Sequence, residues 1–558
     1  MQVETGLALA AAAMLVVAGA AAVGPRLRIP APLILVVLGV GVSAALLPFV
    51  GPVELLPQEV QAELLLAGIL PPLLYAASVS LPAADLRREF GTVSVLSVLL
   101  VVASALLLGL VFAWLIPGLG YGWGVALGAV ISPTDAVATS IVKQAGASHR
   151  ITAILEGESL LNDASALVIL RAAMASAGAA VSVWGVVGQF AWAVVGAVVI
   201  GLVVGRASLW LRRRVTDPTV STVLSFTVPF VASVPAEVLN ASGLVAAVAA
   251  GLVVGRRGPR VLPPQVRRND ENNWSSVSLV LEGAIFLLMG LQIAAIVSRA
   301  GGARFGLLAL GLAAVAVVAA LLIRAAFVAP LLGLLSLNAR RGSQSRQRVQ
   351  EMQRQLEAGE PVILRSPRGR EKRIDRQGRR RFDQQGLRRR LTQVLADIDY
   401  LTSSRLGAKE GTVIVWAGMR GAVTVAAAQT IEAGETLPEQ QRNLLVLVAF
   451  GVAALSLLLQ GGTLAALLRV LRPAEDDPAA LEQERQQVLR LVQDAAEAVP
   501  EAPGESRKQH VLQRLEASRG ALLDARDLGV YDAAVLGHVL ATIDSGQITL
   551  EMQGGPVG

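Results

Sequence analysis

The chain has 558 residues, of which 54% are hydrophobic and only 16% are charged, and its formal net charge is +7. Soluble domains average about 25% charged residues, so this chain is too apolar to be an ordinary soluble protein of its length. It contains no cysteine, which excludes disulfide frameworks, thiolate metal sites and cysteine catalysis. Its three histidines are scattered, which argues against a zinc site of ordinary composition.

The apolar residues gather in blocks long enough to cross a bilayer, which predicts an all-α polytopic membrane protein. The first block is interpreted as a membrane span and not as a cleaved signal, because Glu4 precedes it and Arg26 and Arg28 follow it. About thirteen blocks are predicted, at 6–23, 30–50, 62–80, 92–116, 121–142, 151–175, 182–205, 219–235, 239–255, 274–297, 305–335, 411–430 and 443–470.

Basic residues alternate between successive loops and so predict the orientation of the chain. Loops after even-numbered spans hold few basic residues, namely Arg299, Arg304 and Arg442. Loops after odd-numbered spans are basic: they hold Arg26 and Arg28; Arg87 and Arg88; Lys143 and Arg150; Arg212 to Arg214; and Arg256, Arg257, Arg260, Arg267 and Arg268. Since basic loops stay in the cytoplasm, we expect a plasma-membrane protein with its N-terminus outside and its C-terminus inside.

Two segments outside the spans divide the chain. We expect transporter-type membrane domains at 1–337 and 411–471, a basic cytoplasmic loop at 338–410, and a cytoplasmic helical domain at 472–558. The loop is rich in arginine, but a basic segment between spans more often serves topology or contacts anionic lipid than nucleic acid. Neither segment carries a catalytic motif.

One apolar span carries an unusual group of polar residues, EGESLLNDA at 156–164. On a helix, Glu158, Ser159, Asn162 and Asp163 fall within an arc of about 140°, with Glu156 at its edge. Asp163 lies roughly 18 Å along the span, near the middle of the membrane. A charge there costs at least about 2.5–3.5 kcal/mol, so it needs either a permanent basic partner or a function.

The preceding span contains a second polar stretch, SPTD at 132–135. Pro133 removes a backbone donor and disfavours helix at Ser132, which predicts either a simple kink or a broken helix. Broken helices occur in membranes where they line a cavity, and their open ends bind ions. Thr134 and Asp135 would add oxygen ligands there, which hard cations prefer. A carboxylate such as Asp163 that binds either a cation or a proton is the minimal part of an exchanger.

The motifs in this order resemble those of the monovalent cation:proton antiporter-1 family, the sodium/proton exchangers. The resemblance rests on SPTDAVA at 132–138, EGESLLNDA at 156–164, LEGAIFLLMGLQ at 281–292 and WAGMRGAV at 416–423. It covers about residues 1–470. It implies two inverted repeats with crossed broken helices, in a homodimer. The fifth and twelfth spans would cross, the latter broken between Gly418 and Gly421.

The resemblance also implies roles for individual residues. Asp163, beside Asn162, would carry the cation and the proton, with Thr134 and Ser159 as further ligands of Na⁺. Asp135 would bind or orient ligands at the helix break.

Four charged residues would have supporting roles. Glu158 would pair with Arg324, a pairing that the cost of either charge alone in a membrane also favours. Arg420 would support the crossover or the cytoplasmic access route, and Glu282 would be structural.

The same resemblance implies that one cation is exchanged per proton, electroneutrally, with no cofactor and no enzymatic activity, in the service of pH homeostasis. One departure concerns selectivity, because LPPLLYAAS places Ala76 where family members often have an acidic residue. K⁺ or Li⁺ in place of Na⁺ therefore remains open.

Three alternatives are weaker. GLGYG at 118–122 resembles a potassium-channel filter but occurs once and lacks the preceding Thr-Val. Asp135 and Asp163 could suggest an intramembrane aspartyl protease, but neither has the Gly-x-Gly-Asp setting. His149 could sense pH, but a solvated loop histidine is the commoner case.

Overall fold

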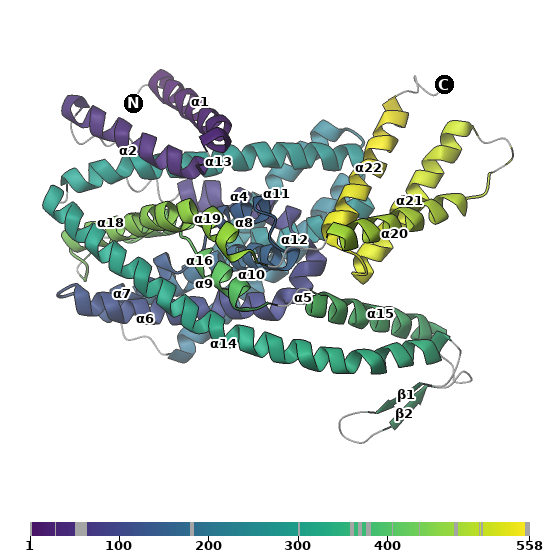
Figure 1. The fold of residues 1–558 in the computed structure, drawn as a ribbon. Coiled ribbons are helices and arrows are strands. Elements are labelled where there is room, and N and C mark those ends of the chain that lie inside the picture. The colour runs from purple at the N-terminus through teal and green to yellow at the C-terminus, as the bar shows by residue number, and fades with distance from the viewer. Residues whose placement is uncertain are drawn as a thin grey trace. The chain divides into compact units, whose positions relative to one another are not determined.

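The computed structural model describes residues 3–27, 29–50, 64–178, 183–299, 302–357, 362–365, 371–374, 381–403, 406–432, 434, 436–473, 478–501, 503 and 506–552. They form two compact units, one of residues 1–328 and 412–473, the other of residues 329–411 and 474–558. Helices dominate both (Figure 1). The all-α membrane architecture predicted from the sequence is confirmed.

The first unit is a bundle of apolar helices. Its elements are α1 (Val3–Leu27), α2 (Ala31–Val50), the π-helix η1 (Leu64–Ile69), α4 (Leu70–Ser80), α5 (Ala83–Ser94), the π-helix η2 (Val95–Leu99), α6 (Leu100–Leu115), α7 (Tyr121–Ile131), α8 (Val137–Gln144), α9 (His149–Gly178), α10 (Val183–Arg212), α11 (Pro218–Val238), α12 (Gly243–Val261), α13 (Pro264–Arg299), the start of α14 (Ala303–Glu357), the end of α16 (Ala408–Trp416), α17 (Ala422–Ala428), α18 (Glu439–Ser456), the π-helix η3 (Leu457–Gly461) and α19 (Gly462–Leu471).

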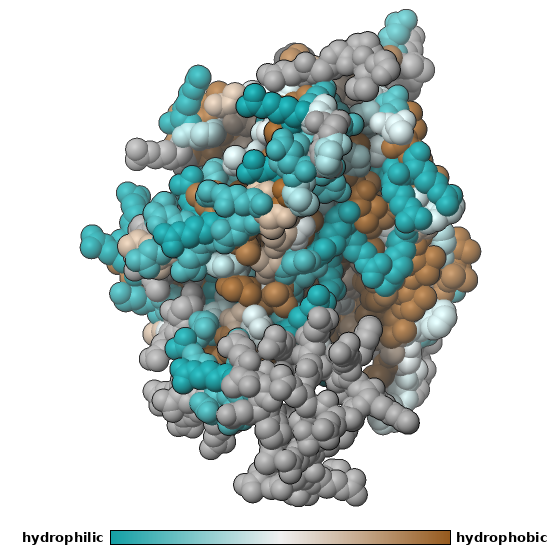
Figure 2. Space-filling model, turned by 90° about the vertical axis from the view of Figure 1, so that its right-hand side faces the viewer, coloured by the Kyte–Doolittle hydropathy of each residue, from teal (hydrophilic) through white to brown (hydrophobic). Residues whose placement is uncertain are grey.

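Each predicted apolar block falls on one of these helices or on two or three consecutive ones. Within the described ranges, eight helices are long and apolar enough to cross a membrane, and shorter apolar helices lie at 31–45, 65–80 and 121–131. The total of thirteen spans and the inverted repeats remain predictions. Large apolar side chains such as Trp114 and Leu322 are exposed on these helices, and hydrophobic surface is visible in Figure 2. Such surface suits contact with lipid.

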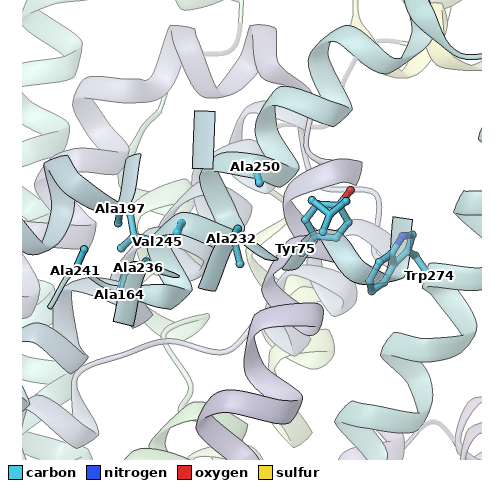
Figure 3. Packing of buried hydrophobic residues seen from close by; sticks show 12 residues of the cluster. Tyr75, Ala164, Ala197, Ala232, Ala236, Ala241, Val245, Ala250 and Trp274 are labelled. Carbon is cyan, nitrogen blue, oxygen red and sulfur yellow. The ribbon is translucent and has the colours of Figure 1, made fainter. Parts of the chain in front are cut away.

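Small residues let the helices of this unit approach one another closely. Figure 3 shows a cluster made largely of alanines from α10, α11 and α12, with Tyr75 and Trp274 at one end. A Cβ atom on Gly205 of α10 would lie 2.9 Å from the carbonyl oxygen of Ala250 on α12. Packing through small residues is how helices associate in lipid, where there is little hydrophobic driving force between them.

The second unit contains the remaining elements. They are the end of α14, the antiparallel strands β1 (Val362–Arg365) and β2 (Glu371–Ile374), α15 (Arg381–Ser403), the start of α16, α20 (Pro478–Glu497), α21 (Arg507–Leu528) and α22 (Ala533–Met552). Helices α20, α21 and α22 bury Val488, Leu522 and Val539 in a shared core. Within α14 and α15, Val349 packs with Leu391 and Ile398.

The eleventh candidate span ends at Leu337, close to the predicted end near residue 335. The helix that carries it, α14, continues beyond the span to Glu357, into the segment predicted as a basic loop at 338–410. The cause is local: no proline occurs between Pro330 and Pro361, and the segment is rich in strong helix formers such as Arg, Gln and Leu. The short hairpin of β1 and β2 was not predicted either.

A buried ion pair joins three helices of the first unit. The Arg212 guanidinium, at the end of α10 and 1% exposed, is paired with the Asp270 carboxylate on α13. It also donates a hydrogen bond to the Ser221 hydroxyl on α11, at 3.0 Å. Because a buried cation that loses its partner retains its full desolvation cost, this pair is expected to matter for stability.

We therefore predict that Asp270→Asn lowers the free energy of unfolding by about 3–5 kcal/mol, because the Arg212 charge stays buried without a counter-charge. Thermal unfolding of the purified protein in detergent measures this. Glu271→Gln removes a charge from the neighbouring exposed position and is the matched control. Equal unfolding temperatures for the two variants would contradict the prediction.

Candidate cation site

Two interrupted helices meet at the centre of the first unit. One is broken between α7 and α8, at residues 132–136, and the other between α16 and α17, at residues 417–421. The backbone N–H of Asp135 in the first break donates to the carbonyl oxygen of Met419 in the second, at 2.8 Å. The breaks expected at Pro133 and in GMRG are thus both present, and their main chains are in contact.

Two glycines make this close approach possible. A Cβ atom on Gly421 would overlap the Asp135 carboxylate, and one on Gly418 would lie 2.6 Å from Nε of Arg324. Any larger residue at either position would have to displace a charged side chain. The glycines predicted to flank the break therefore leave the room in which charged groups sit.

Arg420 satisfies the open carbonyl groups at the crossing. Its side chain is 2% exposed and donates through Nε to the carbonyl oxygen of Ile131, the last residue of α7, at 3.0 Å, and also to that of Gly418. Its backbone N–H donates to the Ser456 hydroxyl at 2.9 Å. A cation is favourable at the carboxyl end of a helix, so Arg420 is placed to stabilise the ends of α7 and α16.

Glu158 and Arg324 form a buried ion pair beside the crossing. Two nitrogen atoms of Arg324 contact the two carboxylate oxygens of Glu158: Nη2 lies 2.7 Å from Oε2, and Nη1 contacts Oε1. Nε of Arg324 donates to the carbonyl oxygen of Ile414, at 3.0 Å. This bidentate geometry is the strong form of an arginine–carboxylate contact. The Arg324 charge is therefore committed to Glu158 and to the end of α16.

The polar stripe of α9 is linked to the first helix break. Nδ2 of Asn162 donates to the Thr134 hydroxyl at 2.7 Å, and that hydroxyl donates to Oε1 of Glu158 at 3.4 Å. Helix α9 itself is continuous from His149 to Gly178. The stripe thus faces the crossing and joins Glu158, Asn162 and Thr134 in one network.

Several side-chain oxygen atoms on α9, on α17 and in the first helix break are buried and have no hydrogen-bond partner among the described residues. They are Oδ1 of Asp163, Oδ2 of Asp135, Oδ1 of Asn162 and Oγ1 of Thr424. Asp163 is 5% exposed and Asn162 1% exposed. Buried oxygens normally find partners, so a set without them suits a cation or a proton that they share.

The other candidate residues are placed less directly. The Ser159 hydroxyl donates to the carbonyl oxygen of Glu156 on its own helix, at 3.2 Å, and no hydrogen bond joins it to Asp163. Glu282, on α13, makes no hydrogen bond or ion pair to the crossover residues within the described part of the chain. Ala76 is partly buried in α4 beside the alanine-rich cluster.

His149 is not a solvated loop residue, which the sequence analysis had considered the commoner case. Its Nε2 lies 2.7 Å from Oδ2 of Asp85, on α5, and its side chain is only 23% exposed. The adjacent Arg150 is paired with Glu89 at 2.6 Å. The start of α9 is thus tied to α5 by two charged contacts.

Sequence reasoning missed Ser456 on α18, which contacts Arg420, and Thr424 on α17, whose buried hydroxyl has no hydrogen-bond partner among the described residues. Each is a hydroxyl residue within an apolar helix, where a bond to the helix's own backbone is the ordinary outcome. A positional signal exists for Thr424, which lies four residues after Arg420, near the start of α17. Ser456 carries no comparable signal because its contact with Arg420 spans 36 positions.

The fold and the site define a helical membrane protein with two crossed, broken helices beside a buried carboxylate. A family described as "Sodium/hydrogen exchanger, transmembrane" matches residues 12–349, and the chain belongs to that family.

Two named relatives and one solved structure are similar to this chain. The Escherichia coli protein YjcE, named an uncharacterized Na(+)/H(+) exchanger, is 37% identical over 244 residues, which are 42% of this chain and 44% of that protein. A Bacillus subtilis protein named "Sodium, potassium, lithium and rubidium/H(+) antiporter" is 30% identical over 249 residues, 43% of this chain and 37% of its own length. The chain thus matches less than half the length of either relative.

The solved structure is that of the sodium proton antiporter from Methanocaldococcus jannaschii at pH 8. It aligns with a TM-score of 0.57 at 17% identity and covers 84% of this chain and all of its own. At 17% identity, this similarity shows a shared fold and nothing more.

The fit of Gly421 against Asp135 leads to a first prediction for this site. Gly421→Ala should lower the free energy of unfolding by about 1–3 kcal/mol, because the new methyl group has to displace the Asp135 carboxylate. Gly462→Ala is the control, since a Cβ there meets nothing within 4 Å. Unfolding of the two purified variants in detergent makes the comparison. Equal stability of the two variants would show that the crossing has room for a methyl group at position 421.

The ion pair leads to a second prediction. Arg324→Ala should lower the free energy of unfolding by about 3–5 kcal/mol, because Glu158 is then buried as an uncompensated charge. Adding Glu158→Gln to that variant should restore part of the loss, a coupling that a double-mutant cycle of unfolding measurements reveals. Strictly additive effects would show that the two side chains do not depend on each other.

Proposed function

We propose that this protein exchanges Na⁺ for H⁺ across the membrane, with Asp163 as the group that binds either ion. The observation that carries the proposal is the contrast between two buried carboxylates on α9. Glu158 is neutralised by Arg324, whereas Oδ1 of Asp163 has no partner among the described residues. A buried charge without a partner is costly, so Asp163 is stable only with a bound proton or cation.

The surrounding oxygens support binding of a monovalent cation at Asp163. Thr134 and Asp135 lie at the first helix break, Asn162 reaches Thr134 from α9, and Thr424 adds a buried hydroxyl from α17. Ser159 belongs to this proposed set through its place on the same stripe, with a lone pair left on its hydroxyl. Oxygen ligands suit Na⁺, which would bind chiefly at Asp163, Thr134 and Ser159.

The mechanism follows from competition for one carboxylate. With the site open to one side, Na⁺ displaces the proton from Asp163, and the helices around the crossing then move to open the site to the other side. Because one carboxylate carries either one cation or one proton, exchange is one-for-one and electroneutral. Contact between two broken helices supports such alternating access, since their short halves can shift as units.

We also propose a location, an orientation and an oligomeric state for the transporter. It spans the plasma membrane with the N-terminus outside and the C-terminus in the cytoplasm, acts as a homodimer, and serves pH homeostasis. The basic residues that alternate between loops support this orientation. Membership of an exchanger family supports transport over proteolysis, for which Asp135 and Asp163 would have to share a peptide substrate.

K⁺/H⁺ exchange on the same scaffold is the second candidate. The B. subtilis relative is named for sodium, potassium, lithium and rubidium, and this chain carries Ala76 in its third apolar block. Selectivity depends on cavity size and ligand geometry, so the cation has to be found by measurement.

We predict that Na⁺ dissipates a preformed ΔpH across proteoliposomes of the purified protein and that Asp163→Asn abolishes this response, because the amide can no longer exchange a proton for a cation. Parallel additions of K⁺ and Li⁺ identify the transported ion. Asp494→Asn, at an exposed position of α20, is the matched control and should keep full activity. Exchange that survives in Asp163→Asn would refute the assignment of Asp163.

A further inference from the structure

The helices of the first unit pack in two groups. Helices α1, α2, α4 and α10 to α13 pack mainly on one another and form a supporting group. Helices α5 to α9 and α17 to α19 likewise pack mainly on one another and form a site group, which contains the polar stripe of α9. Asp163 lies where the groups meet, because the next residue, Ala164, packs with Ala197 of α10 and Ala236 of α11 (Figure 3). Movement of one group against the other would therefore change access to Asp163.

An ion pair joins the two groups. Nη1 of Arg171, on α9, donates to Oε2 of Glu237, on α11, at 3.0 Å. The other carboxylate oxygen of Glu237 accepts the backbone N–H of Gly243, the first residue of α12, at 2.9 Å. Glu237 is thus held within the supporting group by one oxygen and contacts the site group through the other.

A pair of amide side chains also joins the groups. Nε2 of Gln429, directly after α17, donates to Oε1 of Gln292, on α13, at 2.5 Å. The two contacts lie at similar distances along the chain from the cation site. Arg171 is eight residues beyond Asp163, and Gln429 is eight residues beyond Gly421, which corresponds to roughly 12 Å of helix in each case.

Both contacts lie at the same end of the bundle. Each of the four residues lies in the carboxyl-terminal part of its helix or directly after it. Helices α11 and α13 run in the same direction: Arg212 joins Ser221 of α11 to Asp270 of α13, and one turn further along both helices Trp274 donates to Ser225 at 3.0 Å. In the proposed orientation, α9, α11, α13 and α17 belong to even-numbered spans, so their carboxyl ends face the outside.

We propose that Arg171 and Glu237, together with Gln292 and Gln429, form an outer latch that keeps the outer side of the boundary closed. While the latch is intact, Asp163 is closed to the outside. When the site group moves and the site opens outward, both contacts break. The four are positioning residues, which bind no cation and set how often the site opens to each side. This inference rests on the proposed exchange function and orientation.

The exposure of the ion pair sets the size of the expected effect. The Arg171 and Glu237 side chains are 56% and 43% exposed. Exposed ion pairs contribute little to the stability of a folded protein, so loss of this pair should leave the fold intact. An exchanger visits both states in every cycle, so a contribution of this size is enough to change the ratio of the two states by about two- to fivefold.

The first test measures the apparent KM for Na⁺ on each side of the membrane, in vesicles that hold the protein in one orientation. Arg171→Gln should raise the ratio of the cytoplasmic KM to the outer KM about two- to fivefold, because the outward-open state becomes more populated. Glu237→Gln should do the same, since its amide oxygen can still accept the Gly243 N–H. The double variant should change the ratio no further than either single variant does.

The matched control is Arg206→Gln, which removes an exposed arginine of α10 that donates to a carbonyl oxygen of its own helix. It should leave the ratio unchanged. A merely structural role for Arg171 would lower the yield of folded protein or kcat and would not alter the ratio of the two KM values. An unchanged ratio in Arg171→Gln, or an equal change in Arg206→Gln, would overturn the proposal.

A second measurement does not depend on transport. The chain contains no cysteine, so introduced cysteines carry spin labels at known positions. Ala175→Cys on α9 and Val238→Cys on α11 place one label on each group, at exposed positions near the ion pair. Adding Arg171→Gln should shift the label distances, measured by electron paramagnetic resonance, toward longer values. If they shift in a protein that exchanges no ions, the exchange function fails and the latch stands. If they do not shift, the latch is refuted whether or not ions are exchanged.

Discussion

The pairing of Glu158 with Arg324 is the interaction on which the rest of the site depends. Both side chains are buried at membrane depth, where a single charge is costly, and their bidentate contact neutralises both. Because Arg324 is committed to Glu158, it is not available to Asp163 five residues further along α9. Glu158 therefore has a basic partner, whereas Oδ1 of Asp163 has no hydrogen-bond partner among the described residues. The network from Glu158 through Thr134 to Asn162 ties the polar stripe of α9 to the first helix break.

The crossing of the broken helices gives that network its position. Main chain that leaves a helix inside a membrane exposes carbonyl groups that lipid cannot satisfy. Here Arg420 satisfies the carbonyl oxygens of Ile131 and Gly418, and Asp135 donates its backbone N–H to Met419. Gly421 leaves the space that the Asp135 carboxylate occupies. The same residues that make the break tolerable thus place a carboxylate beside the stripe of α9.

Much of this could be predicted from the sequence because the relevant signals are local. Apolar blocks predicted where helices lie, Pro133 and GMRG predicted the breaks, and the spacing of Glu158 and Asp163 predicted one polar face. What could not be predicted depends on contacts between distant residues. Ser456 meets Arg420 and Asp270 meets Arg212 only after the helices have packed. The continuation of α14 to Glu357 was not predicted, because the apolar pattern that marks the span ends before the helix does.

The most direct test of the account counts the protons released when a cation binds. Purified protein in weakly buffered solution with a pH-sensitive dye is titrated with Na⁺, K⁺ and Li⁺ near the pH at which Asp163 is protonated. If one carboxylate binds either ion, about one proton leaves per cation bound, and Asp163→Asn releases none. Cation binding without proton release, or equal release from Asp163→Asn, would contradict the claim that Asp163 is the shared site.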